Sequence, residues 1–326
     1  MRRLSVLIAA GLAGLPALAA EPALRLPLDC APGETCWIAN YVDVDPGPGA
    51  QDFRCRPRSY DGHKGVDFAI RDQAEMRRGV EVRAAAAGVV TALRDFMPDR
   101  LSPGKDAAGI AGRECGNGVI VAHDDGWETQ YCHMRQGSVR VRKGERVAAG
   151  AALGLVGLSG NTEFPHLHLT VRHGDAVIDP FTGRPMSAGC GAEGRPLWAE
   201  PIAYEGFALY NAGLSGQVPD AAAIRAGERE PESLPRDVPA LVLWADMFGV
   251  AAGDRLTFRI TGPDGGVFFE ETLPVDRTQA RRFVYAGRKR PAEGLQAGAY
   301  TGTVTLARPS DDGPGSRTVS RSVTVE

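Results

Sequence analysis

Between residues 65 and 180 the sequence consists of short β-rich runs separated by glycines, and this pattern restricts the fold more than any other feature. Each run is only a few residues long and is bounded by turn-forming residues, which is typical of antiparallel sheets. The pattern therefore predicts an antiparallel β domain. The predicted strands are 66–70, 80–84, 88–94, 119–123, 127–133, 153–157 and 166–172.

A longer stretch, residues 95–116, interrupts this series and carries Pro98, Pro103 and several glycines. We expect a long loop here. Loops of this length usually have a function or lack a fixed structure.

The last third of the chain has a different composition. Ala, Gly, Pro and Glu are frequent between about residues 206 and 240, which predicts an interdomain linker. Beyond it, runs of alternating apolar and polar residues lie between turns such as 262–266, and they fit a small immunoglobulin-like β-sandwich. The predicted fold class is therefore mainly β. The predicted strands of the sandwich are 241–244, 255–260, 267–273, 281–285, 300–306 and 318–325.

The first residues have the form of a secretory signal peptide. Arg2 and Arg3 precede an apolar run at 4–18, and residues 17–19 have the small-x-small form of a cleavage site. The apolar run is short for a membrane span, so we expect cleavage near residue 20 and no stable membrane insertion afterwards. The formal net charge is −3, and a slightly acidic chain of this kind does not indicate binding to nucleic acid.

The chain has six cysteines, an even number that suggests disulfides in an exported protein. Cys115 and Cys132 bracket a predicted hairpin, and we predict a disulfide across it. The other four cysteines can be paired in several ways, which the sequence does not decide.

Three short motifs in the first domain contain four of the six histidines. In the first motif, His63 and Asp67 offer an imidazole and a carboxylate, both of which suit zinc. Gly65 lies between them, and we expect its freedom to let the backbone turn so that the two side chains converge.

The second motif is a strictly alternating strand. Because a strand has a period of two residues, His166, His168 and Thr170 share one face, while Leu167, Leu169 and Val171 enter the core. Two imidazoles on one face can meet one metal centre.

The third motif ends the strand 127–133 with His133. A lone histidine says little, but three such motifs in one domain indicate a metal or proton-transfer site.

At this point the sequence resembles the lysostaphin-like, or LytM-type, zinc endopeptidases of peptidoglycan metabolism. The resemblance covers about residues 62–180, and its elements occur in the family's order. They are His-x-Gly-x-Asp at 63–67, Ala-x-x-Gly-x-Val at 85–90, Gly-Asn-x-Val-x-Val-x-His at 116–123, Tyr-x-His at 131–133, Lys-Gly-x-x-Val at 143–147, Gly-x-x-Gly-x-Ser-Gly-Asn at 154–161 and His-Leu-His at 166–168.

Carried over position by position, the resemblance implies that His63, Asp67 and His168 bind one zinc ion per chain. It also implies that His133 and His166 act on substrate and water, and it leaves open which of them is the base. Three protein ligands leave a fourth zinc position for water, whose pKa the metal lowers. The 95–116 insertion departs from the family pattern, and we expect it to lie beside the cleft and restrict the substrate.

Three further residues have simpler interpretations. His123 lies on a family motif but is not among the ligands, and we predict a structural, hydrogen-bonded side chain. His173 follows a strand end and is expected to be exposed. Asn117 is expected to fix a loop near the site through its amide.

The resemblance implies a zinc metalloendopeptidase, periplasmic or extracellular, that cuts peptidoglycan stem peptides or cross-links. The alternative is a non-catalytic LytM-type module that binds the cell wall or activates other hydrolases. The C-terminal domain binds the wall, binds a protein partner or is a structural appendage, and the sequence leaves these three open. The predicted organisation is a signal peptide at 1–20, a cysteine-containing segment at 21–58, a LytM-type domain at 59–200, a linker at 201–238 and a β-sandwich at 239–326.

Overall fold

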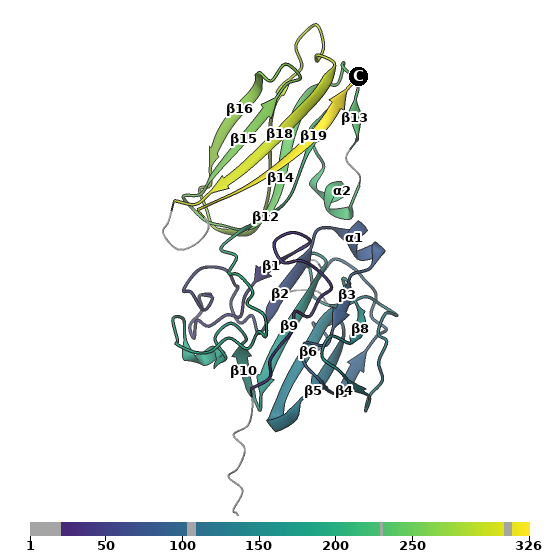
Figure 1. Ribbon diagram of the computed structural model, residues 1–326, viewed down its shortest axis with the longest axis vertical. Helices are drawn as coiled ribbons and strands as arrows, with labels where there is room; N and C mark the ends of the chain where they lie inside the picture. Colours follow the sequence, from purple (N-terminus) through teal and green to yellow (C-terminus); the bar gives the residue numbers. More distant parts are fainter. Residues whose placement is uncertain (1–20, 103–108, 229–230, 310–314) are drawn as a thin grey trace, which may run out of the picture.

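The computed structural model describes residues 21–102, 109–228, 231–309 and 315–326, so the predicted signal peptide lies outside the described residues. The described residues form two β domains that lie one above the other in Figure 1. The prediction of a mainly β fold is confirmed, and α1 (Gln73–Arg78) and α2 (Ala221–Ala226) are the α-helices of the described part. None of the described helices has the length and apolar character needed to cross a membrane.

The first domain is built on an antiparallel sheet in the order β1-β2-β9-β6-β5-β4-β7, extended by β10 and β11 beside β9. A smaller sheet pairs β3 with β8. All seven strands predicted between residues 66 and 172 are present, with ends shifted by a few residues. The strands are β1 (Cys36–Asn40), β2 (Val66–Ile70), β3 (Glu81–Arg83), β4 (Gly88–Arg94), β5 (Asn117–Ala122), β6 (Trp127–Met134), β7 (Arg146–Val147), β8 (Ala152–Leu155), β9 (His166–His173), β10 (Ala176–Asp179) and β11 (Arg184–Pro185).

Strand β9 is central to this sheet, between β2 and β6. Its alternation is confirmed, because Leu167, Leu169 and Val171 are buried in the core of the domain. The register places Asp67 of β2 directly beside His168 of β9. Strand pairing therefore brings together two side chains that are distant in the sequence.

The second domain is a β-sandwich, as predicted. One sheet has the order β12-β14-β17 and the other β13-β19-β18-β15-β16. Their inner faces enclose a separate core that includes Leu243, Phe258 and Val304. The strands are β12 (Ala208–Ser215), β13 (Ser233–Leu234), β14 (Ala240–Val250), β15 (Arg255–Thr261), β16 (Val267–Pro274), β17 (Gln279–Lys289), β18 (Gly298–Ala307) and β19 (Ser316–Val325).

The predicted linker at 201–238 is wrong in one respect, because it contains structural elements of the sandwich. Strand β12 pairs with β14 from Ala208 opposite Phe248 to Ser215 opposite Val242. Helix α2 and strand β13 follow it. The small residues of β12 hid the strand from sequence reasoning, because strand formation here depends on pairing with β14 more than on intrinsic propensity.

The two domains meet through a buried cluster. Trp37 of β1 packs with Tyr210 of β12 and Phe248 of β14. Arg58, which is buried, donates to the carbonyl oxygens of Ala39 at 2.8 Å and Glu205 at 3.1 Å. These contacts are apolar or hydrogen-bonded and fix the sandwich against the edge of the first sheet.

Three disulfides lie in the first domain, and the predicted Cys115–Cys132 bridge is one of them. The others are Cys30–Cys36 and Cys55–Cys190. The last joins the N-terminal segment to residues beyond β11, so that segment is covalently tied to the domain that follows it.

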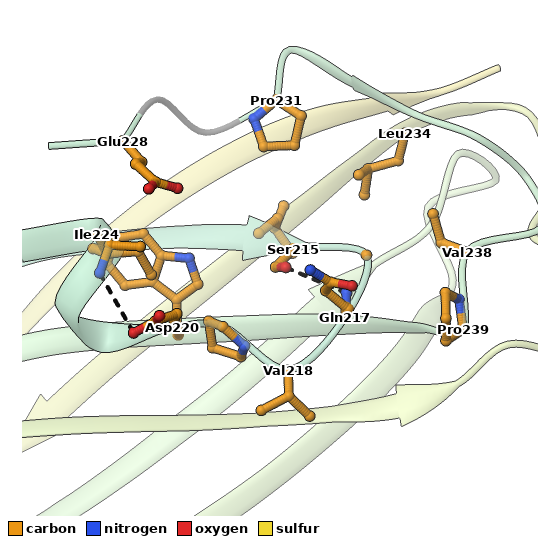
Figure 2. A pocket seen from close by; sticks show the side chains of 15 residues that line it. Ser215, Gln217, Val218, Asp220, Ile224, Glu228, Pro231, Leu234, Val238 and Pro239 are labelled. Atoms are coloured by element: carbon orange, nitrogen blue, oxygen red, sulfur yellow. Dashed lines mark hydrogen bonds between the residues drawn. The ribbon is translucent and has the colours of Figure 1, made fainter.

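The sandwich carries a hollow of about 380 Å³ beside α2. Asp220 caps this helix by accepting the backbone N–H of Ala222 at 2.8 Å. None of the residues that line the hollow belongs to the cleft described below. Figure 2 shows its apolar side chains, among them Val218, Ile224, Leu234 and Val238.

Glu205 is a buried carboxyl group at the domain junction, where it accepts the N–H of Ile38 at 3.0 Å. Burial raises its pKa from 4.5 to about 7. Because the folded-state pKa lies above the unfolded value, the contribution of Glu205 to the free energy of unfolding is fully present below about pH 4.5 and is lost as the pH rises through about 7.

We therefore expect Glu205→Gln to be about as stable as the wild type near pH 4 and more stable by roughly 2–3 kcal/mol at pH 8. Urea unfolding measured from pH 4 to pH 8 checks this. Glu200→Gln, which alters an exposed glutamate, is the control. A constant difference between Glu205→Gln and wild type over this range would contradict the prediction.

Candidate metal centre

His63, Asp67 and His168, the three predicted metal ligands, converge on one point. His63 Nε2 lies 3.1 Å from Asp67 Oδ1 and 3.0 Å from His168 Nδ1, and the latter two atoms are 2.9 Å apart. Ligand atoms of a tetrahedral zinc with bonds of 2.0–2.1 Å lie about 3.3 Å apart. The triangle therefore has nearly the size that one zinc ion requires, and its nitrogen and oxygen donors suit that ion.

Hydrogen bonds on the far side of each ring determine which nitrogen faces the centre. His63 Nδ1 is 2.6 Å from the carbonyl oxygen of Tyr41, which can only accept, so Nδ1 carries a proton and Nε2 offers a lone pair. His168 Nε2 is 3.0 Å from Thr170 Oγ1, which can accept a hydrogen bond from an Nε2–H group, and in that tautomer Nδ1 offers its lone pair to the centre. Such outer partners are the usual means of orienting metal-binding histidines.

Gly65 is required by close packing, whereas the sequence suggested a turn conformation. Gly65 does not have a positive φ, so its backbone conformation does not require glycine. A Cβ atom at this position, however, would lie 2.6 Å from His168 Nε2 and 2.5 Å from the carbonyl oxygen of Leu169. The absence of a side chain at residue 65 thus lets the His168 ring approach β2.

Asp67 is only 2% exposed. Asn40 Nδ2 donates to Asp67 Oδ2 at 2.8 Å, which leaves Oδ1 facing the histidines. Burial opposes ionisation of this carboxyl, but the charge of His63 and the charge and hydrogen bond of His166 outweigh it and hold its pKa well below the usual range. Asp67 is therefore an anion at neutral pH, as a metal ligand must be.

His133 and His166, the other two predicted residues, lie beside the triangle with ring centroids 4.6 Å apart. His133 Nδ1 donates to the carbonyl oxygen of Ser159 at 2.8 Å, and His166 Nδ1 donates to that of Phe164 at 2.9 Å. In the neutral tautomer of each, Nε2 is the nitrogen left for chemistry. Burial and the nearby His166 and His168 hold the pKa of His133 well below its usual value.

The backbone at His133 has φ of 62°, a conformation that a residue with a side chain rarely adopts. Its N–H donates to the carbonyl oxygen of Cys115 at 2.8 Å, and the neighbouring Cys132 is disulfide-bonded to Cys115. The cross-link thus fixes the end of β6, where strained backbone is consistent with a functional position.

A cleft of about 460 Å³ opens beside this group. Asp67, His133 and His166 line it, together with Tyr60, whose ring lies 4.5 Å from that of His63. Sequence reasoning missed Tyr60 and Asn40, because neither belongs to a recognisable motif. It also missed the contribution of the sandwich, which lines the cleft with Phe248, Gln279, Ala280 and Arg281.

The remaining expectations for single residues are confirmed. His123 is structural, with Nδ1 2.7 Å from the Ala87 carbonyl oxygen and Nε2 2.9 Å from Thr129 Oγ1. His173 is exposed and stacks on Trp127. In the described part of 95–116 no strand or helix occurs, as expected of a loop.

Asn117 ties this loop to the end of β6. Its Oδ1 accepts the Met97 N–H at 2.8 Å, and Nδ2 donates to the carbonyl oxygens of Met97 at 2.7 Å and Met134 at 3.2 Å. Met134 directly follows His133, so the amide holds the loop next to the site. The expected role of Asn117 is confirmed.

Comparison with known proteins gives matches that each cover part of the chain. The model of the family described as Peptidase family M23 matches residues 61–180. The cell division protein DipM of Caulobacter vibrioides is 30% identical over 115 residues, which are 34% of this chain and 17% of that protein. The peptidoglycan DD-endopeptidase ShyA of Vibrio cholerae is 30% identical over 128 residues, 39% of this chain and 22% of that protein. The matches therefore span about a fifth of the length of these relatives.

Among solved structures, that of a putative peptidase M23 from Pseudomonas aeruginosa is 26% identical, covers 51% of each chain and has a TM-score of 0.30.

We expect Asn117→Ala to lower the free energy of unfolding by about 2–4 kcal/mol, because the N–H and the carbonyl oxygen of Met97 lose their partner and the Met134 carbonyl oxygen keeps only the Ser159 hydroxyl. Chemical denaturation provides the measurement. Asn211→Ala removes an amide that makes no side-chain hydrogen bond to any described residue, and it should have a smaller effect. Equal destabilisation by both substitutions would show that the three bonds contribute little.

Proposed function

Because residues 61–180 form a domain of peptidase family M23, we propose that this chain is a zinc-dependent endopeptidase acting on peptide bonds of peptidoglycan. The observation that carries the proposal is the triangle of His63 Nε2, Asp67 Oδ1 and His168 Nδ1. Two ring nitrogens and a carboxylate oxygen about 3 Å apart can direct their lone pairs at one point, an arrangement that a bound cation would stabilise. We propose the predicted LytM-type domain at 59–200 as the unit that carries the activity.

In this proposal the three ligands hold one zinc ion, which would lower the pKa of a water molecule and polarise the scissile carbonyl group. Two neighbouring histidines handle protons. His133 has a depressed pKa and a proton fixed on Nδ1, so its Nε2 can accept a proton from water. His166 Nε2 faces the same centre, 3.4 Å from Asp67 Oδ1. We therefore propose His133 as the base and His166 as the donor to the developing oxyanion.

The substrate is proposed from the relatives. ShyA is named as a peptidoglycan DD-endopeptidase. The family model matches residues 61–180, which contain all five site residues. Export to the periplasm or the extracellular space is proposed from the signal-like first residues and from the three disulfides, which persist in oxidising compartments. Mass analysis of the products of a peptidoglycan digest tests the activity. Intact peptidoglycan after incubation with zinc-loaded protein would favour the non-catalytic alternative.

We expect one zinc ion per wild-type chain, and we expect His168→Ala to lose the bound zinc and nearly all cleavage, because only two ligands remain. Zinc content by elemental analysis and a peptidoglycan digest provide the two measurements. His173→Ala changes an exposed histidine on the same strand and should keep both properties. A wild-type protein that binds no zinc would overturn the proposal.

His133→Ala and His166→Ala are expected to keep the zinc ion and to lower kcat by about 10²–10⁴-fold, the usual contribution of a proton-transfer group. The distinction from a ligand substitution is the metal content, which should stay at one per chain. If either variant lost its zinc while His168→Ala kept it, the division of roles between the histidines would be wrong.

A further inference from the structure

The sandwich forms one wall of the peptidase cleft. Phe248 of β14 and Gln279, Ala280 and Arg281 of β17 line the same hollow as Asp67, His133 and His166. The ring of Phe164, which lies 4.6 Å from that of His166, is 5.1 Å from the ring of Phe248. A substrate bound at the histidines therefore lies next to the second domain.

A second hollow, of about 670 Å³, adjoins the cleft and is strongly basic. Gln279 and Arg281 line both hollows. We call the second hollow the arginine groove, after Arg225, Arg277, Arg281 and Arg282. Asp276 is the one carboxylate among its lining residues.

Two of these arginines are held rigidly by Asp246, a carboxylate that is only 1% exposed. Arg225 binds both oxygens of Asp246, at 2.7 and 2.9 Å, and Arg281 Nη2 lies 3.1 Å from Oδ2. The Arg281 guanidinium also donates to the hydroxyl of Tyr210, at 2.6 and 3.0 Å. One buried carboxylate facing two guanidinium groups leaves a net positive charge at the edge of the cleft.

The other two arginines are free to bind a ligand. Arg277 is exposed, and neither Arg277 nor Arg282 forms an ion pair with any described residue. Arg282 Nη1 makes only a long contact, 3.4 Å, with Gln279 Oε1. A guanidinium group presents a planar fork of N–H donors that matches a carboxylate, and several of them around one groove favour an anion.

We propose that the arginine groove is a subsite of the cleft that binds carboxylate groups of the peptide substrate. The inference rests on the proposed function for the choice of a peptide, and it adds that the preferred peptide is acidic on the side facing the sandwich. Arg281 connects the arginine groove with the cleft at the histidines. Its guanidinium lies 5.6 Å from the ring centroid of Phe164, and the Phe164 ring packs on His166. Arg277 and Arg282 are the specificity-determining residues, and Asp246 positions Arg281 and Arg225.

The test compares two substrates and two double variants of the full-length, zinc-loaded protein. The substrates are a purified cross-linked muropeptide with free carboxylates and the same compound with its carboxylates amidated. The test variant is Arg277→Gln/Arg282→Gln. The control variant is Arg255→Gln/Arg288→Gln, which removes the same charge from exposed strand positions, Arg288 being six residues along β17 from Arg282 and so about 20 Å away.

For the acidic muropeptide we expect the test variant to raise KM about tenfold with kcat unchanged, the size of effect that a lost charge-assisted contact produces. The amidated muropeptide should be cleaved equally by wild type and test variant, and the control should behave as wild type. Equal loss on both substrates, no change on the acidic one, or the same loss in the control would overturn the proposal.

Dissociation constants separate this inference from the proposed function. They are measured for both muropeptides with His133→Ala as the background, alone and combined with each double variant, so that turnover does not interfere. If wild type cleaves neither muropeptide, the proposed activity fails, and these constants still decide the subsite. A tenfold weaker binding of the acidic compound only in the test variant supports the groove, and unchanged binding overturns it.

Discussion

The buried carboxylate of Asp67 is the constraint on which the rest of the structure depends. An isolated buried charge is strongly unfavourable, so every neighbouring element must supply a partner for it. Asn40 of β1 donates to one oxygen, while His63, His166 and His168 surround the other. The sheet places β1, β2 and β9 side by side, and this order lets Asn40, Asp67 and His168 meet around one charge.

The second domain has a direct relation to this centre. Its strands β14 and β17 bring an aromatic ring and a guanidinium group to the cleft, and the buried Asp246 fixes the guanidinium of Arg281. The apolar cluster of Trp37, Tyr210 and Phe248 holds the sandwich in place. The two domains therefore build one cleft, with the candidate metal ligands on one wall and positive charge on the other.

Sequence reasoning succeeded where local pattern determines structure. The alternation from His166 to Val171 predicted both the strand and the two faces of its side chains, because a strand has a fixed period of two residues. The spacing of Cys115 and Cys132 around one hairpin predicted their bridge. Sequence reasoning failed for β12, whose small residues form a strand only through pairing with β14. It also gave the wrong reason for Gly65, which is important because it lies close to His168.

The sequence by itself determined the residue types that form the candidate metal centre and the strands that carry most of them, since side-chain chemistry and strand periodicity are local properties. Only the tertiary structure decided which atoms face the centre, because the carbonyl oxygen of Tyr41 and the hydroxyl of Thr170 select the nitrogen that each ring presents. The same holds for Asn40, Tyr60 and Arg281. Their contacts with the site join residues far apart in the chain, and such contacts depend on strand order and domain packing, which no local pattern encodes.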